Sequence, residues 1–77
     1  MITPQDIGQA VRRARKALGL RQDELAAAAG VGLRFLVELE RGKPTVQLGR
    51  TLQVLDAVGL HVRVAERSGA SDPGGPS

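Results

Sequence analysis

The sequence predicts an all-α domain of four to five short helices, followed by one C-terminal β-strand. Apolar residues recur at three- and four-residue spacing along most of the chain, and glycines follow these segments at positions 19, 30, 42 and 59. Only after Gly59 does the spacing change to strict alternation. A chain of 77 residues is long enough for one domain with a modest core. We therefore expect a single domain over residues 1–66.

The first helix is predicted from Pro4 to about Leu18. Thr3 offers an N-cap hydroxyl and Pro4 suits the first helical position, while Gly19 supplies the stop. The apolar face consists of Ile7, Ala10, Val11, Ala14 and Leu18. The remaining face carries Arg12, Arg13, Arg15 and Lys16.

Two further helices are predicted on either side of a short turn. The first spans Arg21 to Ala29 and is rich in alanine, so that another helix can cross it closely. The turn is Gly30-Val31-Gly32, and the second helix covers residues 33–41 and ends at Gly42. Its inward face is predicted to carry Leu36 and Leu39.

A fourth helix is predicted to begin at a Thr45 cap, with Leu48, Leu52 and Leu55 as its apolar stripe. Val54 and Val58 are displaced to one side of that stripe, where we expect no use for them inside a monomer.

Residues 60–66 are predicted to form the strand, because apolar residues at 60, 62 and 64 alternate with His61, Arg63 and Ala65. A lone strand lacks backbone partners, so we expect it to pair with the same segment of a second molecule across a two-fold axis. The alternative is a solvated, extended tail. The predicted dimerisation residues are Val54, Val58, Leu60, Val62 and Val64. Residues 67–77 contain almost nothing to bury and are expected to be disordered.

The charge distribution favours a polyanionic partner. Residues 1–43 hold eight Lys/Arg against five Asp/Glu, whereas residues 44–77 hold three of each. Solvated, arginine-rich helix faces are the simpler alternative.

Several functional classes are excluded by composition. The chain has no cysteine and a single histidine, His61, and no acid pair lies near a nucleophile in a recognisable spacing. We expect no enzymatic activity, no metal site and no cofactor. The apolar stretches are too short for a membrane span and the N-terminus lacks the layout of a signal peptide. A cytoplasmic, nucleoid-associated protein is therefore expected.

The spacing of residues 22–41 is that of a helix-turn-helix, in which the second helix enters the major groove and the first crosses the DNA backbone. The stretch from Leu18 to Lys43 resembles the Cro/C1-type (XRE, phage-repressor-like) family, and the resemblance extends from about Ile7 to Leu60. It rests on Gln22, Glu24-Leu25-Ala26, Gly30-Val31, Leu36 and Leu39-Glu40-Arg41-Gly42. The resemblance implies a lambda-repressor-like helix-turn-helix domain.

The predicted groove-facing residues follow from helical geometry. At about 100° per residue, with Leu36 and Leu39 facing inward, the outward positions are Arg34, Val37, Glu38 and Arg41. Arg34 can fork onto guanine and Glu38 can accept from cytosine N4, although these two residues can instead form a surface ion pair. Leu33 lies near the helix N-terminus, where it can pack on a thymine methyl group.

The resemblance also assigns supporting roles. It implies that Gln22 binds phosphate or braces the recognition helix, with Arg21 and Lys43 as further phosphate contacts. Glu40 is expected to bridge to a basic residue of the first or second helix, and Phe35 to pack at the edge of the core. The family usually has small or polar residues at positions such as Gly32, Leu33 and Phe35, so the apolar residues here depart from its pattern.

Four short helices followed by an apolar strand and a tail are similar to the HipB-type antitoxins, whose strands pair in the dimer and which bind a kinase-like toxin. This resemblance implies a homodimer that binds a palindromic operator in double-stranded DNA, represses a toxin–antitoxin operon and neutralises a HipA-like kinase toxin. The alternatives are a free-standing repressor without a toxin and a protein-interaction module that has lost DNA binding.

Overall fold

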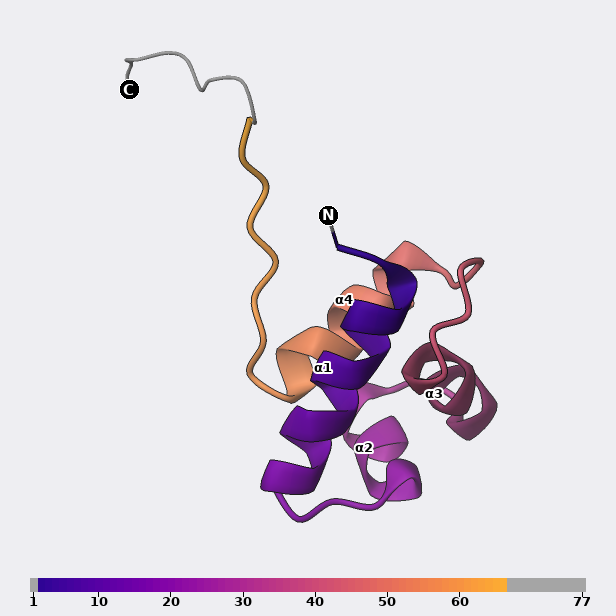
Figure 1. Cartoon of the computed structure of the whole chain (residues 1–77). Coiled ribbons are helices and arrows are strands. Elements are labelled where there is room, and N and C mark those ends of the chain that lie inside the picture. Colours follow the sequence, from indigo (N-terminus) through magenta and orange to yellow (C-terminus); the bar gives the residue numbers. More distant parts are fainter. Residues whose placement is uncertain (1, 67–77) are drawn as a thin grey trace.

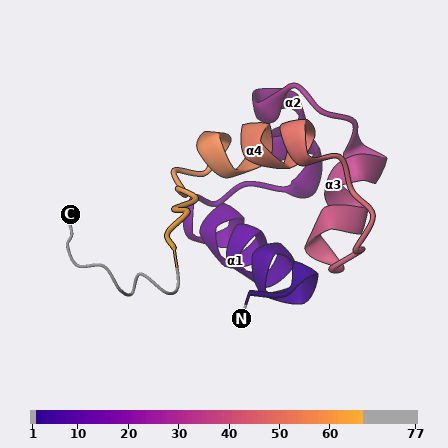
Figure 2. The same cartoon turned by 90° about the horizontal axis from the view of Figure 1, so that it is seen from above.

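Four α-helices make up the fold of residues 2–66, the part of the chain that the computed structural model describes (Figure 1). They are α1 (Pro4–Ala17), α2 (Gln22–Ala29), α3 (Leu33–Glu40) and α4 (Leu48–Ala57). Helix α1 packs against α3, and α2 packs against both α3 and α4. Figure 2 shows the helices arranged around a common centre. The all-α helix-turn-helix prediction is confirmed, whereas the predicted disordered tail lies outside the described residues.

The starts of the first two helices follow the sequence signals. At α1, the backbone N–H of Asp6 donates to Thr3 Oγ1 over 3.1 Å, and the N–H of Thr3 donates to Asp6 Oδ2 over 3.0 Å. This reciprocal pair satisfies two backbone donors that the helix leaves free. At α2, the N–H of Arg21 donates to Glu24 Oε1 over 2.8 Å. The two helices therefore begin within one residue of their predicted positions.

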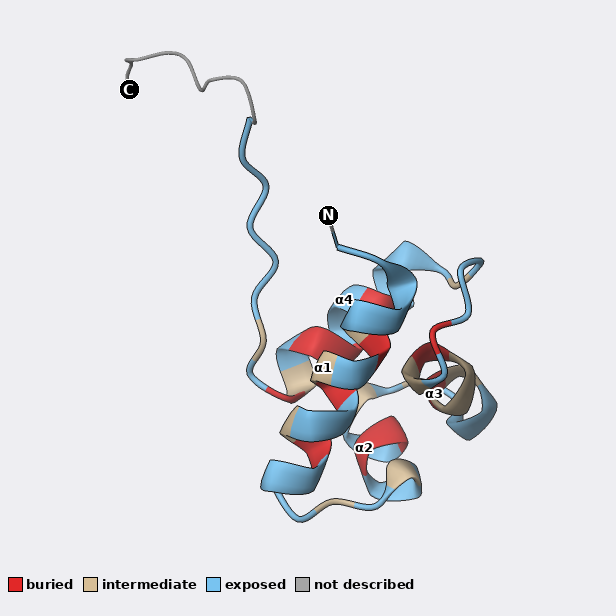
Figure 3. Cartoon of the chain, viewed as in Figure 1, coloured by how far each residue is buried: buried red, intermediate tan, exposed pale blue. Residues whose placement is uncertain are grey.

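The core is aliphatic and draws on all four helices. Val11, Leu25, Leu36 and Val54 are fully buried, one from each helix. Figure 3 shows that the buried residues line the sides of the helices that face one another. Phe35 is half-buried and packs against this core, as predicted.

Helices α1 and α3 approach each other at a glycine. A methyl group added at Gly8 would lie 2.5 Å from the carbonyl oxygen of Leu39 and 2.8 Å from that of Glu40. Backbone atoms cannot move aside as a flexible side chain can, so only glycine fits here. This contact holds the C-terminal half of α3 against α1.

Two predictions for the fourth helix are wrong. Helix α4 begins at Leu48, with Gln47 rather than Thr45 as its N-cap. Its inward face carries Thr51, Val54 and Leu55, and its C-cap is Val58, all of them buried. Val54 and Val58 therefore belong to the core of the monomer. The expected stripe is largely on the surface instead, because Leu48 is 71% exposed and Leu52 is 44% exposed.

The sequence pattern was misleading because a polar residue occupies the buried face of α4. The hydroxyl of Thr51 donates to the carbonyl oxygen of Gln47 over 2.8 Å, which satisfies it within its own helix and permits burial. In addition, half-buried Val46 packs against the core from the loop before the helix. Thr45 therefore lies in the loop before α4 and does not cap the helix.

The C-terminal segment leaves the helices after Leu60. The N–H of Leu60 donates to the carbonyl oxygen of Leu55 over 2.8 Å, and its side chain packs against the core. Residues 61–66 are exposed and have no strand pairing in the single chain (Figure 1). His61, Val62 and Arg63 still line a pocket together with residues of α1. Strand pairing across a dimer stays a prediction. No helix within residues 2–66 combines the length and apolar character needed to cross a membrane.

Candidate nucleic-acid interface

The inner side of α3 is held by a buried polar network. Arg15 of α1 donates to Glu40 through Nε over 2.7 Å and through a terminal nitrogen over 3.1 Å. Gln22 of α2 donates to the same carboxylate through Nε2 over 3.1 Å. The remaining guanidinium nitrogen of Arg15 donates to the carbonyl oxygen of Leu20 over 2.8 Å. One carboxylate on α3 thus ties three helices together.

This network confirms that Glu40 bridges to a basic residue of the first helix, but it corrects the position of Arg15. The sequence pattern predicts Arg15 on the polar face of α1, yet it is buried. Its hydrogen bond with Glu40 raises the pKa of the guanidinium above its ordinary value, against the opposing effect of burial. A sequence signal was present, because Arg15 follows Val11 by four residues and so shares its face.

Gln22 uses its amide to brace α3, which is one of the two roles that the family resemblance implies for it. Because its Nε2 donates to Glu40, the bond joins the first helix of the motif to the second. The other implied role, contact with a DNA phosphate, stays a prediction.

The C-terminus of α3 ends in a glycine turn that positions Lys43. Gly42 has φ = 86°, a left-handed conformation that favours glycine. Its N–H donates to the carbonyl oxygen of Leu39 over 3.0 Å, and the N–H of Lys43 donates to that of Glu38 over 3.1 Å. These two bonds form a Schellman motif, which satisfies carbonyls at the helix end. The backbone of Lys43 is thereby fixed one helical turn beyond Glu38.

The outer face of α3 carries the residues predicted to face the groove. The side chain of Arg34 is 92% exposed, and Leu33 and Arg41 are also exposed. Val37 and Glu38 are half-buried. The structure therefore places four of these side chains on the surface of α3 and the fifth, Arg41, at its C-cap, away from the buried Leu36 and Leu39.

Glu38 lies between two cations on this face. Its Oε1 is 3.3 Å from Lys43 Nζ, and its Oε2 is 3.9 Å from Arg34 Nε. The surface ion pair between Arg34 and Glu38, which the sequence left open as an alternative, is thus present in the free chain. Such an exposed pair contributes little to stability and can open at low cost.

Arg21 lies at the start of α2 and is exposed. Its Nε is 3.0 Å from Asp23 Oδ1, and one of its terminal nitrogens is 3.6 Å from Glu24 Oε2. The hydrogen bond between Arg21 and Asp23 raises the pKa of Arg21 and lowers the pKa of the Asp23 carboxyl. Arg21 therefore has acidic neighbours with which any phosphate must compete.

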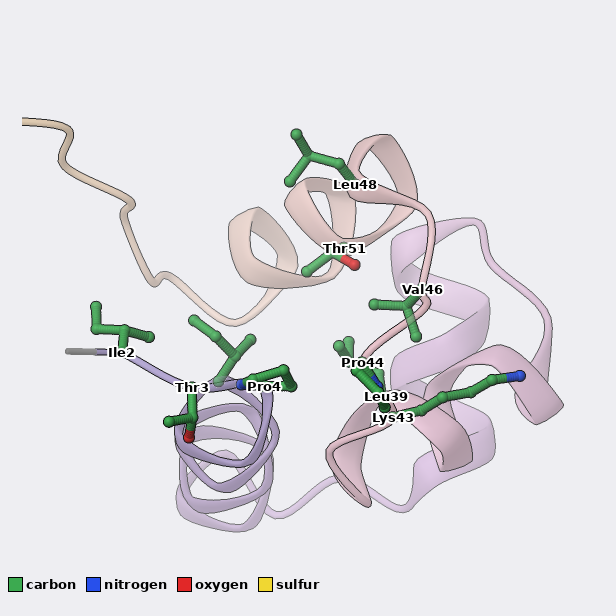
Figure 4. A pocket seen from close by; sticks show the side chains of 10 residues that line it. Ile2, Thr3, Pro4, Leu39, Lys43, Pro44, Val46, Leu48 and Thr51 are labelled. Atoms are coloured by element: carbon green, nitrogen blue, oxygen red, sulfur yellow. The ribbon is translucent and has the colours of Figure 1, made fainter.

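A groove at the C-terminal end of α3 is apolar. It has a volume of about 280 Å³ and lies where the N-terminus of α1, the end of α3 and the loop before α4 meet (Figure 4). The side chain of Lys43 reaches away from the apolar residues (Figure 4). Among residues 2–66, no cluster of three His, Cys, Asp or Glu side chains could hold a metal ion.

Comparisons with known proteins agree with this geometry. A family model described as Helix-turn-helix matches residues 11–64. The uncharacterized HTH-type transcriptional regulator y4mF of Sinorhizobium fredii (strain NBRC 101917 / NGR234) is 60% identical over 62 residues, which is 80% of this chain and 82% of that protein.

Solved structures of HipB share the fold. The HipB-O4 20mer complex superimposes with a TM-score of 0.76 at 19% identity, covering 87% of this chain and 94% of that one. The HipB(S29A)-O2 20mer complex has the same TM-score and identity, covering 87% and 93%. The family match spans most of the sequence, and the resemblance inferred from the residues is confirmed. The chain therefore belongs to the XRE-type helix-turn-helix family, a family of DNA-binding transcriptional regulators rather than enzymes.

Proposed function

We propose that this protein is a sequence-specific repressor that inserts α3 into the major groove of its operator. The single observation that carries the proposal is that Arg15 and Gln22 hold α3 from its inner side through Glu40, while its outer side chains stay on the surface and form only exposed ion pairs. A helix that is already rigid before binding loses little conformational entropy on docking. Base-reading side chains are then presented at a defined position.

The proposed roles follow from chemistry and exposure. Arg34 pairs with guanine O6 and N7, Glu38 accepts from cytosine N4, and Leu33 packs on a thymine methyl group. Val37 and Arg41 complete the groove-facing set. Arg21, Gln22 and Lys43 contact phosphates and fix the register without reading bases.

We further propose that the protein binds a palindromic operator as a homodimer. Residues 61–66 are exposed and unpaired in the single chain, and Val62 and Val64, which are 54% and 94% exposed, alternate with polar residues there. Pairing of this segment across a two-fold axis, with Leu60 at its base, would satisfy its backbone groups. Because Val54 and Val58 are core residues, they are no longer part of the proposed interface. Exposed Leu48 and Leu52 of α4 offer apolar surface to a second molecule instead.

The test is fluorescence anisotropy with the DNA upstream of the protein's own gene and with a random duplex of equal length. We expect tight binding to the upstream DNA, with an affinity that falls steeply with salt as bound counterions are released. Sedimentation should give a dimer at micromolar concentration. A monomer that binds neither duplex at low salt would contradict the proposal and favour the alternative of a protein-interaction module.

We also propose that the repressor is the antitoxin of a type II toxin–antitoxin operon, cytoplasmic and associated with the nucleoid, that neutralises a HipA-like kinase. The support is the shared fold with HipB. The test is to express the chain with any kinase-like reading frame next to its gene and to ask whether the two proteins co-purify and whether the kinase loses activity. Without such a reading frame, the free-standing repressor is the better account.

A further inference from the structure

Glu38 places a negative charge on the face of α3 that is proposed to meet DNA. The other glutamate of this helix, Glu40, is buried by Arg15 and Gln22. Glu38 instead has a 33% exposed side chain, with one oxygen 3.3 Å from Lys43 Nζ and the other 3.9 Å from Arg34 Nε. One carboxylate thus holds two cations of the proposed interface at once.

The turn at the end of α3 keeps the backbone of Lys43 close to this carboxylate. The N–H of Lys43 donates to the carbonyl oxygen of Glu38 over 3.1 Å, and the left-handed Gly42 fixes the turn between them. The backbone of Lys43 is therefore kept close to Glu38, so that its flexible side chain can reach the carboxylate, with Nζ 3.3 Å from Oε1. A carboxylate and a phosphate offer a lysine the same kind of acceptor, so the two compete for it.

We propose that Glu38 is a specificity residue that acts by competition, occupying Lys43 and Arg34 unless the DNA offers the carboxylate a donor of its own. This inference rests on the proposed function. Some duplexes offer no base amino group where Glu38 meets the groove. On such a duplex, Lys43 or Arg34 can bind a phosphate only by leaving Glu38, and the carboxylate then lies near the phosphates without a cation. On the operator, a base amino group such as cytosine N4 takes the carboxylate and releases both cations to the DNA.

The consequence is that Glu38 weakens binding to random DNA more than binding to the operator. Specificity is a difference between two affinities, and a repulsive element directed against the wrong partner increases it. A purely structural ion pair would have no such effect, because removing it would change helix stability alone.

The experiment compares Glu38→Gln with Asp56→Asn. Both variants remove one negative charge, but Asp56 is exposed on α4 and forms no ion pair within residues 2–66. Affinity is measured for the upstream DNA and for a random duplex, and the salt needed for elution from heparin is measured in parallel. Thermal unfolding of each variant controls for folding.

We expect Glu38→Gln to bind the random duplex about three- to tenfold more tightly than Asp56→Asn does, with a salt slope steeper by about one. The ratio of operator to random affinity should fall by about tenfold. In a Lys43→Gln background the gain on random DNA should shrink, because one of the two captured cations is gone. On heparin, Glu38→Gln should elute at higher salt than Asp56→Asn.

The inference is overturned if Glu38→Gln behaves like Asp56→Asn on both random DNA and heparin, or if its gain is undiminished by Lys43→Gln. In that case the wild-type chain can still prefer its upstream DNA, and the proposed function stands alone. A wild-type chain without any such preference overturns the proposed function instead. Heparin is a polyanion without bases, so the salt needed for elution from it measures whether Glu38 competes for Lys43 and Arg34 independently of any base contact.

Discussion

Two glutamates on α3, only two residues apart, lie in opposite environments. The side chain of Glu40 is 4% exposed and accepts hydrogen bonds from Arg15 and Gln22, all within 3.1 Å. The side chain of Glu38 is 33% exposed and has looser contacts at 3.3 Å and 3.9 Å. The carboxylate of Glu40 therefore connects three helices through buried hydrogen bonds, whereas that of Glu38 forms exposed ion pairs that can exchange.

The difference shows how a short helix can be held firmly on one side and still exchange its ion-pair partners on the other. A buried charge that loses its partner is left without solvation, so the contacts of Glu40 are hard to open. An exposed ion pair exchanges with water and with other ions at little cost. We therefore expect substitutions on the inner side of α3 to affect folding and those on the outer side to affect DNA binding.

The largest effect is expected from Glu40→Ala. This change leaves the buried guanidinium of Arg15 uncompensated, at a cost of about 3–5 kcal/mol in the free energy of unfolding. Urea denaturation followed by circular dichroism measures it. The double variant Arg15→Met/Glu40→Leu replaces the pair with apolar side chains and should recover most of the loss. A stable single variant would show that the network does not hold α3.

Gly8→Ala should come next, at about 3 kcal/mol, because the added methyl group would meet the backbone carbonyls of Leu39 and Glu40. Gly49→Ala is the matched control. Gly49 lies in the first turn of α4 and an added methyl group there meets nothing within 4 Å. We expect the control to be neutral or slightly stabilising in the same denaturation assay. Equal losses in the two variants would argue against a close approach of α1 and α3.

On the outer side, Arg34→Ala should leave the stability unchanged and cost about 1–3 kcal/mol in operator binding, through lost discrimination at one base pair. Lys43→Ala should weaken all sequences about equally and lower the salt slope by about one. Anisotropy titrations with operator, single-base variants and random DNA separate the two patterns. Equal losses from both substitutions on operator and random DNA would contradict the assigned roles.

The smallest effect is expected at the exposed pair of Arg21 and Asp23. The hydrogen bond from Arg21 lowers the pKa of Asp23 below its ordinary value. Since the folded-state pKa is the lower one, the small stabilisation is complete above about pH 4 and is lost as the pH falls through the folded pKa. The difference in melting temperature between the wild type and Asp23→Asn should therefore vanish in acid. A difference that persists unchanged at pH 2 would speak against this ion pair.

Much of the helix-turn-helix could be predicted from sequence because its signals are local. Thr3 and Gly42 mark helix ends through hydrogen bonds with residues a few positions away. The inward position of Leu36 and Leu39 follows from spacing alone. The sequence predicts the salt bridge from Glu40 but not its partner, Arg15. An arginine in a run of basic residues is normally assigned to the surface of a helix.

The rest depends on contacts between segments distant in sequence. Two overlapping apolar patterns run along α4, one through Leu52 and one through Val54, and spacing cannot decide between them. Packing of α4 against α2 decides it, since it buries the face that carries Val54 and Thr51, and Thr51 tolerates burial because its hydroxyl donates to the carbonyl oxygen of Gln47. Likewise, the residues around Gly8 give no sign that the backbone of Leu39 packs against this glycine.

The central claim is that α3, braced by Glu40, reads DNA with its outer face as part of a symmetric pair. DNase I footprinting of the wild-type protein on the region upstream of its own gene tests this most directly. We expect two protected half-sites centred about one helical turn apart, and with Arg34→Ala the same protection only at a protein concentration about ten- to a hundredfold higher. Absence of protection at low salt by a folded chain would contradict it.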